Sequence, residues 1–191
     1  TGLIATTSSG GLVRLQGDVL MPRIDGKRYL EATLNITGIQ DRLGPSLYRA
    51  IPPDGEEIQT SRWPAVDSSR GELLAGLGAE GNIDYSGRIK LNKTGPDQFD
   101  FTFMMSDGSI RPDVNLSKTL EEAGMSWPAE FQLSMCTAEL RVTESELQMR
   151  SFQGHRAGGI VRGSGLMDET TGSNQLELYF RNIQLEEYMV N

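Results

Sequence analysis

The sequence predicts a mainly β protein: antiparallel strands in a curved, elongated sheet, described equally well as a β-groove or as sandwich-like, with one or two short helices. The first observation is a two-residue alternation of apolar and polar residues, which is typical of strands with one solvated face. The second is glycine, with 22 in 191 residues against an average share of about 7%, which favours many turns. The third is the small number of helix signals.

The alternation is clearest in four segments. Residues 30–36 place Ala32, Leu34 and Ile36 on one side, and residues 83–91 alternate from Ile83 to Leu91. Residues 99–105 and 176–180 repeat the pattern with aromatic residues. Weaker patterns predict further strands at 12–20, 130–135, 138–143, 146–152 and 158–167.

The connections carry the remaining local signals. Residues 115–124 begin with Asn115 and end at Gly124, which predicts a short helix. Residues 45–50 and 54–60 are expected to form helical turns interrupted by Pro52 and Pro53. Residues 64–80, with their Pro, Ser and Gly content, are expected to form a loop.

Charge and rare residues narrow the chemistry. Eighteen basic and 26 acidic residues give a net charge of −8, which disfavours binding to a phosphate backbone. Cys136 is the only cysteine and His155 the only histidine, so disulfide scaffolds and zinc fingers are excluded. The residues indicate no catalytic site, no metal site and no cofactor, and the protein is expected not to be an enzyme.

Two distant segments resemble each other. Residues 10–14 (Gly, Gly, Leu, Val, Arg) match residues 158–162 (Gly, Gly, Ile, Val, Arg), and each segment is soon followed by a further glycine. A weaker third copy spans residues 83–110. The recurrence predicts a repetitive β protein whose units bury their apolar strands against neighbouring units.

The segments Leu34-Asn-Ile-Thr-Gly-Ile-Gln, Leu47-Tyr-Arg-Ala-Ile-Pro-Pro and Gly81-Asn-Ile-Asp-Tyr-Ser-Gly-Arg-Ile resemble repeats of the AsmA/TamB-like envelope proteins. So do Val161-Arg-Gly-Ser-Gly-Leu-Met-Asp and the segment from Leu176 onward. The resemblance implies a β-groove that shields or conducts lipid acyl chains between membranes, or supports outer-membrane assembly. It also implies a location in the periplasm or cell envelope, with a membrane anchor that we expect in a segment of the parent chain outside these residues. Since the chain begins at Thr1, we expect an excised piece of a longer protein.

In such a groove, the expected partners are acyl chains and neighbouring repeats of the same parent chain. Apolar walls stabilise an acyl chain by about 0.8 kcal/mol per buried CH₂. The residues expected to face lipid are Ala32, Leu34, Ile36, Phe99, Phe101, Phe103, Met105, Leu176, Leu178 and Phe180. The same strands could instead close against a second sheet as an ordinary core, and periodicity does not separate these alternatives.

The repeat divides the chain into four parts. Residues 1–44 are expected to end one β unit, 45–80 to form a connection, 81–157 to form a central unit, and 158–191 to begin the next unit. Two other functions remain open: a structural or adhesive β-module of a phage or surface appendage, and a carbohydrate-active β protein.

Overall fold

The computed structural model is all-β in the part of the chain that it describes. The described residues are 2–21, 23–24, 27–28, 30–43, 77–92, 98–111, 132–168 and 170–183. The helical segments expected at 45–50, 54–60 and 115–124, and most of the loop expected at 64–80, lie outside these ranges. No segment within these ranges forms a helix, and hence none is an apolar helix able to cross a membrane.

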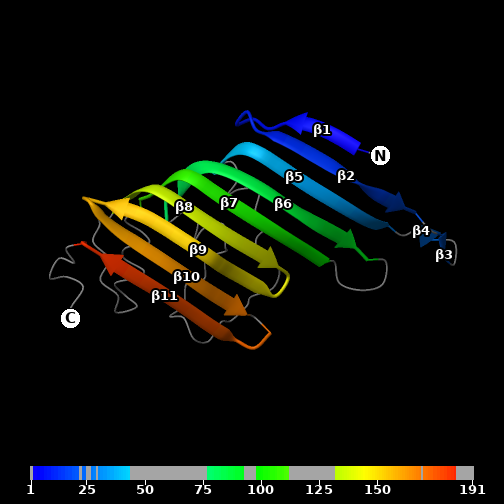
Figure 1. Cartoon of the computed structure of the whole chain (residues 1–191). Coiled ribbons are helices and arrows are strands. Elements are labelled where there is room, and N and C mark those ends of the chain that lie inside the picture. Colours follow the sequence, from blue (N-terminus) through cyan, green and yellow to red (C-terminus); the bar gives the residue numbers. More distant parts are fainter. Residues whose placement is uncertain are drawn as a thin grey trace.

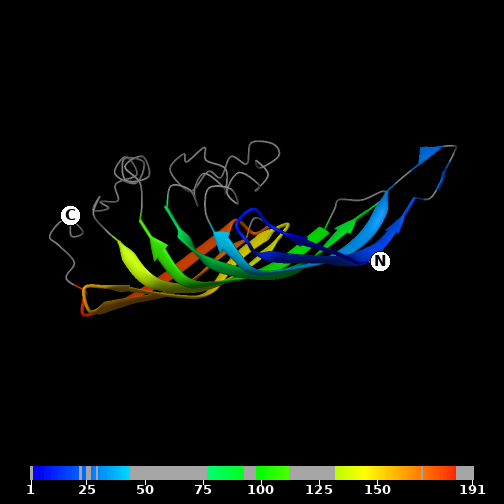
Figure 2. The ribbon, with the colours of Figure 1, turned by 90° about the horizontal axis from the view of Figure 1, so that it is seen from above.

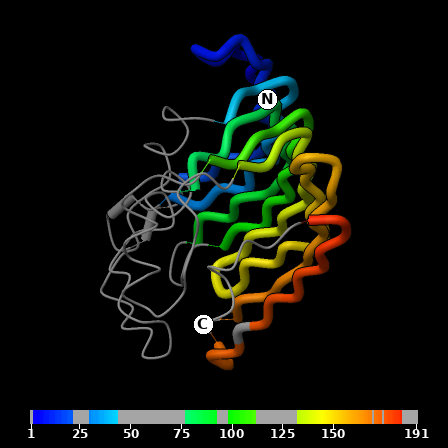
Figure 3. Tube along the Cα trace, turned by 90° about the vertical axis from the view of Figure 1, so that its left-hand side faces the viewer, coloured from blue at the N-terminus to red at the C-terminus, as the bar shows by residue number. Residues whose placement is uncertain are grey.

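Nine strands form one open antiparallel sheet, and their spatial order follows the sequence (Figure 1). The strands are β1 (Gly2–Thr6), β2 (Leu12–Leu20), β5 (Glu31–Leu43), β6 (Glu80–Leu91), β7 (Gln98–Ile110), β8 (Leu133–Thr143), β9 (Glu146–Arg156), β10 (Gly159–Asp168) and β11 (Ser173–Arg181). A separate two-stranded sheet, β3 (Arg23–Ile24) and β4 (Lys27–Arg28), lies in the connection between β2 and β5. Figures 2 and 3 show that the large sheet is curved, so the predicted mainly β class with a curved antiparallel sheet is confirmed.

The strand predictions were correct in position and often too short. The segment 12–20 coincides with β2, whereas β5 and β7 continue well past residues 36 and 105. The two strands predicted at 130–135 and 138–143 are a single strand, β8, which is bent at Met135. The edge strand β1 and the small sheet of β3 and β4 were not predicted, because none of them is long enough to show alternation.

Bulges interrupt three of the strands near one end of the sheet. The pairing register shifts after Gly38 in β5, after Met105 in β7 and after Ser134 in β8. A non-glycine residue with positive φ lies inside each shift: Gln40 (φ 54°), Asp107 (φ 49°) and Met135 (φ 48°). Because each bulge adds one residue and bends its strand, the alternation continues one position later along the chain.

The buried core gathers at this same end of the sheet. Met105, Leu133, Cys136 and Val161 form one buried cluster, and Phe152 and four other half-buried side chains pack against it. Among the described residues, the buried hydrophobic side chains are few: Ala32, Ala79, Ile83, Met105, Leu133, Cys136 and Val161. Cys136 is the largest side chain in the described ranges that is fully buried, so no aromatic ring in these ranges is completely enclosed.

The two matching glycine segments have similar local geometry. Gly10 and Gly158 both lie in turns with positive φ, at 92° and 81°. The glycine that follows each of them is buried, and a Cβ on Gly11 would lie 2.7 Å from the Cα of Asp41. On Gly159, a Cβ would lie 2.5 Å from the carbonyl oxygen of Asn182. Both segments therefore need glycine for the turn and for the close approach of neighbouring backbone, from β5 at Gly11 and from the residue that follows β11 at Gly159.

Candidate functional site

The sheet has one apolar face that continues across all nine strands. Residues directly opposite each other in an antiparallel ladder point to the same face, so the register connects one strand to the next. Leu34 pairs with Ile89, and Ile89 pairs with Phe99. Further along, Phe101 pairs with Val142, and the same relation continues through β9 and β10 to β11. All ten residues expected to face lipid lie on this face, which we call the apolar face.

The ten residues differ in how far solvent reaches them. Ala32 and Met105 are buried, and Met105 belongs to the core cluster. The five on the central strands are half-buried: Leu34, Ile36, Phe99, Phe101 and Phe103. The three on the edge strand β11 are exposed: Leu176 (57%), Leu178 (40%) and Phe180 (41%). Solvent therefore reaches most of these ten side chains at least in part, whereas Met105 is packed in the buried core.

Aromatic rings lie against glycines at the centre of the apolar face. A Cβ on Gly38 would lie 2.2 Å from the ring of Tyr85, and a Cβ on Gly87 would lie 2.4 Å from the ring of Phe101. The Phe103 ring lies between these two aromatic residues, with centroids 6.0 Å from Tyr85 and 5.9 Å from Phe101. The glycines thus leave space for a row of three neighbouring rings, and this space would be lost with any larger residue.

The opposite face is mostly polar and carries pairs of charged side chains. Arg141 donates two hydrogen bonds to the carboxylate of Asp100, at 2.9 and 3.0 Å, and the hydrogen bond is the main reason that the pKa of Asp100 is lowered. Arg150 binds Glu139 at 2.9 Å. Such exposed pairs contribute about 0–1 kcal/mol each to the free energy of unfolding. Their main effect is therefore to make this face hydrophilic.

Asp41 lies on the apolar face and is the one buried charged residue among those that the structure describes, and sequence reasoning missed it. Its Oδ1 accepts hydrogen bonds from the hydroxyls of Thr7 (3.0 Å) and Ser9 and from the backbone amide of Arg42 (2.9 Å). The hydroxyl of Tyr85 lies 3.5 Å from Oδ2. Burial raises the pKa of Asp41, but these hydrogen bonds outweigh burial, and the net pKa is below its ordinary value. The carboxylate therefore ties the β1–β2 turn to the bulge of β5.

Other residues of the apolar face were not named as lipid-facing. The alternation from Ile83 to Leu91 was recognised, but that strand was not assigned to the lipid-facing surface. In β8 and β9, bulges hide which face each strand presents. The apolar residues concerned include Val13, Leu15, Val19, Ile83, Tyr85, Ile89, Leu91, Leu140, Val142, Leu147, Met149, Phe152, Val161 and Met167.

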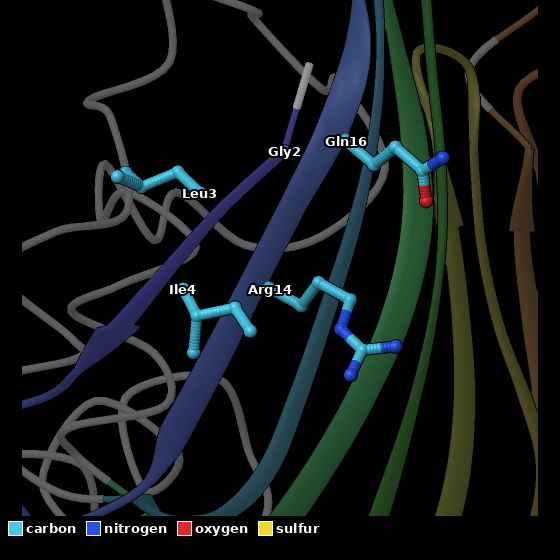
Figure 4. A pocket seen from close by; sticks show the side chains of 5 residues that line it. All are labelled: Gly2, Leu3, Ile4, Arg14 and Gln16. Atoms are coloured by element: carbon cyan, nitrogen blue, oxygen red, sulfur yellow. The ribbon is translucent and has the colours of Figure 1, made fainter.

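A shallow hollow of about 250 Å³ lies beside β1 and β2, away from the centre of the apolar face. It is lined by Gly2, Leu3, Ile4, Arg14 and Gln16. Figure 4 shows Arg14 and Gln16 extending to one side of the strands and Leu3 to the other. Only backbone and a few side chains of an edge surround it, so it lacks the convergent polar groups of a small-molecule site.

The rare residues named from the sequence do not form a reactive centre. Cys136 is fully buried, and burial raises the pKa of its thiol, which disfavours the reactive thiolate. The ring Nε2 of His155 lies 3.2 Å from the side-chain nitrogen of Gln153. Within the ranges that the structure describes, no three His, Cys, Asp or Glu side chains come together as a metal site would require.

In comparisons with known proteins, no protein-family model, no curated protein and no solved structure matches this chain.

Proposed function

We propose that the apolar face holds lipid acyl chains and that the protein is a non-enzymatic part of a longer AsmA/TamB-like envelope protein. In this proposal the apolar face lines the inside of the curved sheet and shields or conducts acyl chains between membranes, or supports outer-membrane assembly. The protein would act in the periplasm, anchored through another segment of its parent chain. The observation that carries the proposal is the continuity of the apolar face over nine strands, with its aromatic rings only half-buried.

The size and chemistry of this face support the proposal. Solvent-accessible apolar side chains follow one another from β2 to β11, which gives a path rather than a closed pocket. Because each buried CH₂ of a ligand contributes about 0.8 kcal/mol, a long acyl chain gains several kcal/mol without any fixed polar contact. Phe and Met side chains adapt to chains that have no fixed shape.

The proposal that the units repeat draws on the two glycine turns. Gly10–Gly11 and Gly158–Gly159 combine a positive-φ turn with a close approach to neighbouring backbone, and each pair leads into a strand that contains a further glycine. In a repetitive sheet, neighbouring repeats of the same parent chain would extend the apolar face at its edges.

A photo-crosslinking experiment tests lipid binding directly. The chain is expressed in a Gram-negative host with the photoreactive analogue p-benzoyl-phenylalanine at Phe101 or Leu178, on the apolar face. Matched controls carry it at Thr102 or Tyr179, the next residues along the same strands, which point to the polar face. We expect lipid adducts, identified by mass spectrometry, from the apolar positions only.

Two results would refute the acyl-chain proposal. The first is an equal yield of lipid adducts at the apolar and polar positions. The second is the absence of any lipid from both the adducts and the extract of the purified protein. Phe101 and Leu178 are suitable probes because an aromatic analogue there replaces an apolar side chain that is already partly accessible.

The exposed edge strand β11 favours a second candidate function, a structural or adhesive module. Leu176, Leu178, Tyr179 and Phe180 are 57%, 40%, 65% and 41% exposed, and its nine pairs with β10 contain no bulge on the β11 side. Unprotected edges of this kind pair readily with other strands. Such a module would form symmetric oligomers without bound lipid, and light scattering combined with lipid extraction separates the two functions.

A further inference from the structure

The strand β11 forms an open edge of the large sheet (Figure 1). It pairs with β10 on one side, and no described strand lies on its other side. The side chains of residues 175–181 are all exposed, including Leu176 at 57% and Tyr179 at 65%. The strand has none of the bulges, prolines or lysines by which proteins commonly protect a free edge. Its outward backbone N–H and C=O groups can therefore bind a further strand.

The direction of the strands shows which further strand fits this edge. Neighbouring strands of the large sheet are antiparallel throughout. Because the sheet has nine strands, its two edge strands, β1 and β11, run in the same direction. A contact between β11 and β1 of a second copy, with both apolar faces on one side, would therefore be parallel. Two β11 strands related by a two-fold axis perpendicular to the sheet are antiparallel, which is the slightly more stable pairing.

The two-fold axis restricts the register of such a pair. Residues directly opposite each other share a face, so one residue of β11 must lie opposite its own copy at the axis. With Glu177 at the axis, two carboxylates would face each other, which is unfavourable. With Leu178 or Phe180 there, no acidic residue lies opposite a basic one. With Tyr179 there, Glu177 lies opposite Arg181 of the second copy, and the same pair occurs twice.

The register centred on Tyr179 also matches the remaining side chains of the strand. On the apolar face, Leu178 and Phe180 would lie opposite each other across the axis, and both are now exposed, at 40% and 41%. Their contact would remove apolar surface from water. On the opposite face the two copies of Tyr179 would form an aromatic cross-strand pair, which is favourable. Residues 177–181 of each copy would pair directly, and five residues is an ordinary strand length.

We propose that two copies of this chain pair through β11, across a two-fold axis at Tyr179, to form a dimer with one continuous sheet. The inference rests on the second candidate function, a module that pairs through an exposed edge, and it adds the partner, the strand and the register. The apolar faces of both copies would lie on the same side, and β1 would stay open to a neighbouring repeat. The contact is small, so the dimer should dissociate on dilution.

Sedimentation velocity of the full chain, over about two orders of magnitude in concentration, tests the proposal. Glu177→Arg and Arg181→Glu each turn both opposite-charge pairs into like-charge pairs. Each single variant should therefore dimerise about tenfold more weakly, or less still. An equal mixture of the two single variants places arginine opposite glutamate again. The mixture should recover dimers to within about threefold of the unchanged protein, because both charge pairs are restored.

Controls separate this contact from an effect of net charge or of folding. Asp18→Arg changes the net charge as much as Glu177→Arg, at an exposed position of β2 far from β11 in the strand order, and it should dimerise like the unchanged protein. Each variant should keep the thermal midpoint of the unchanged protein within a few degrees. Recovery in the mixture also shows that both single variants are folded, since an unfolded chain offers no paired edge.

Crosslinking of single cysteines by a short bis-maleimide locates the axis. Tyr179→Cys would place two thiols opposite each other, so it should give a covalent dimer. Leu176→Cys is the control, because its own copy would lie six positions away along the partner strand, at about 20 Å, and it should give little. The native Cys136 is fully buried and should not react.

Three outcomes would overturn the proposal. One is a monomer at every concentration. Another is a dimer that the single variants do not weaken, or that the mixture does not restore; such a dimer would use another surface and would leave only the broader idea of a symmetric module. The third is equal crosslinking from Tyr179→Cys and Leu176→Cys. Lipid adducts at Phe101 report separately on the acyl-chain proposal, so a monomer that still gives them refutes the dimer alone.

Discussion

Replacement of Asp41 should weaken the attachment of the β1–β2 turn to the sheet. Asp41→Ala removes the acceptor of the Thr7, Ser9 and Arg42 hydrogen bonds at once. Asp41→Asn keeps an oxygen acceptor but loses the charge. The two variants therefore separate the hydrogen-bonding role of the side chain from the role of its negative charge.

The expected magnitude follows from the number and exposure of these bonds. A hydrogen bond to a charged group contributes about 1.5–3 kcal/mol. Ser9 is exposed and Thr7 half-buried, so both hydroxyls can bind water after the change and the losses do not simply add. We expect Asp41→Ala to lower the free energy of unfolding by about 2–4 kcal/mol and Asp41→Asn by about 1–2 kcal/mol. For a chain of this length, 2–4 kcal/mol lowers the thermal midpoint by about 5–15 °C.

The pH dependence has a definite sign. Because the pKa of Asp41 is lower in the folded protein, the unfolded state takes up the proton first as the pH falls. The stabilisation from this carboxylate is therefore complete above the unfolded-state pKa of about 3.9 and is lost as the pH falls through the lower folded-state value. In Asp41→Asn this part of the acid dependence should be missing.

Thermal unfolding followed by circular dichroism between pH 3 and pH 7 measures both effects. Asp84→Ala is the matched control, because Asp84 accepts a hydrogen bond from the amide of Gln40 at 2.7 Å but lies exposed on the polar face. It should lower stability by at most about 1 kcal/mol. If Asp41→Ala matches this control at pH 7, or if Asp41→Asn keeps the full acid dependence, the anchoring role of Asp41 is wrong.

Three further changes test the packing of the sheet, each by its effect on chemical denaturation. Gly87→Ala should destabilise by about 1–3 kcal/mol, because the new Cβ would lie 2.4 Å from the Phe101 ring, and retention of full stability would contradict the packing of this ring. Met135→Gly should be neutral or should raise the free energy of unfolding by up to about 1 kcal/mol, because Met135 has a φ of 48°. Met104→Gly is the control at an exposed position without positive φ, and it should destabilise the protein. Equal effects of the two changes would argue against backbone strain at the bulge. Asp100→Asn should lower the free energy of unfolding by less than about 1 kcal/mol, and by less still in high salt. A large loss of stability that does not depend on salt would show that the exposed pair of Arg141 and Asp100 stabilises the fold more than its position implies.

Much of the sheet could be predicted because its information is local. Alternation in β2, β5, β6 and β7 identifies each strand, and glycine marks the turns. The strands also pair in the order of the sequence, so neighbours in the chain are neighbours in space. For this reason the ten apolar positions predicted from separate segments do lie on one face.

The bulges are the part that the sequence did not reveal. A run such as residues 38–41 has no residue that requires an extra position, and Gln40 and Met135 are poor candidates for positive φ on their own. The bulge nevertheless brings Asp41 onto the apolar face, and the buried carboxylate then meets hydroxyls from a turn more than thirty positions earlier in the chain. Contacts of this kind depend on the pairing of β2 with β5, and a pattern within one segment does not contain them.

By itself, therefore, the sequence determined that the chain forms an antiparallel sheet with one apolar face, because strand periodicity fixes which residues share a side. Only the tertiary structure decided how that face is divided. The bulges gather the sealed core of Met105, Leu133, Cys136 and Val161 at one end, and the glycines beneath Tyr85 and Phe101 leave a row of half-buried rings at the centre. The physical reason is that burial depends on the neighbours that register and curvature supply, and these are properties of the whole sheet.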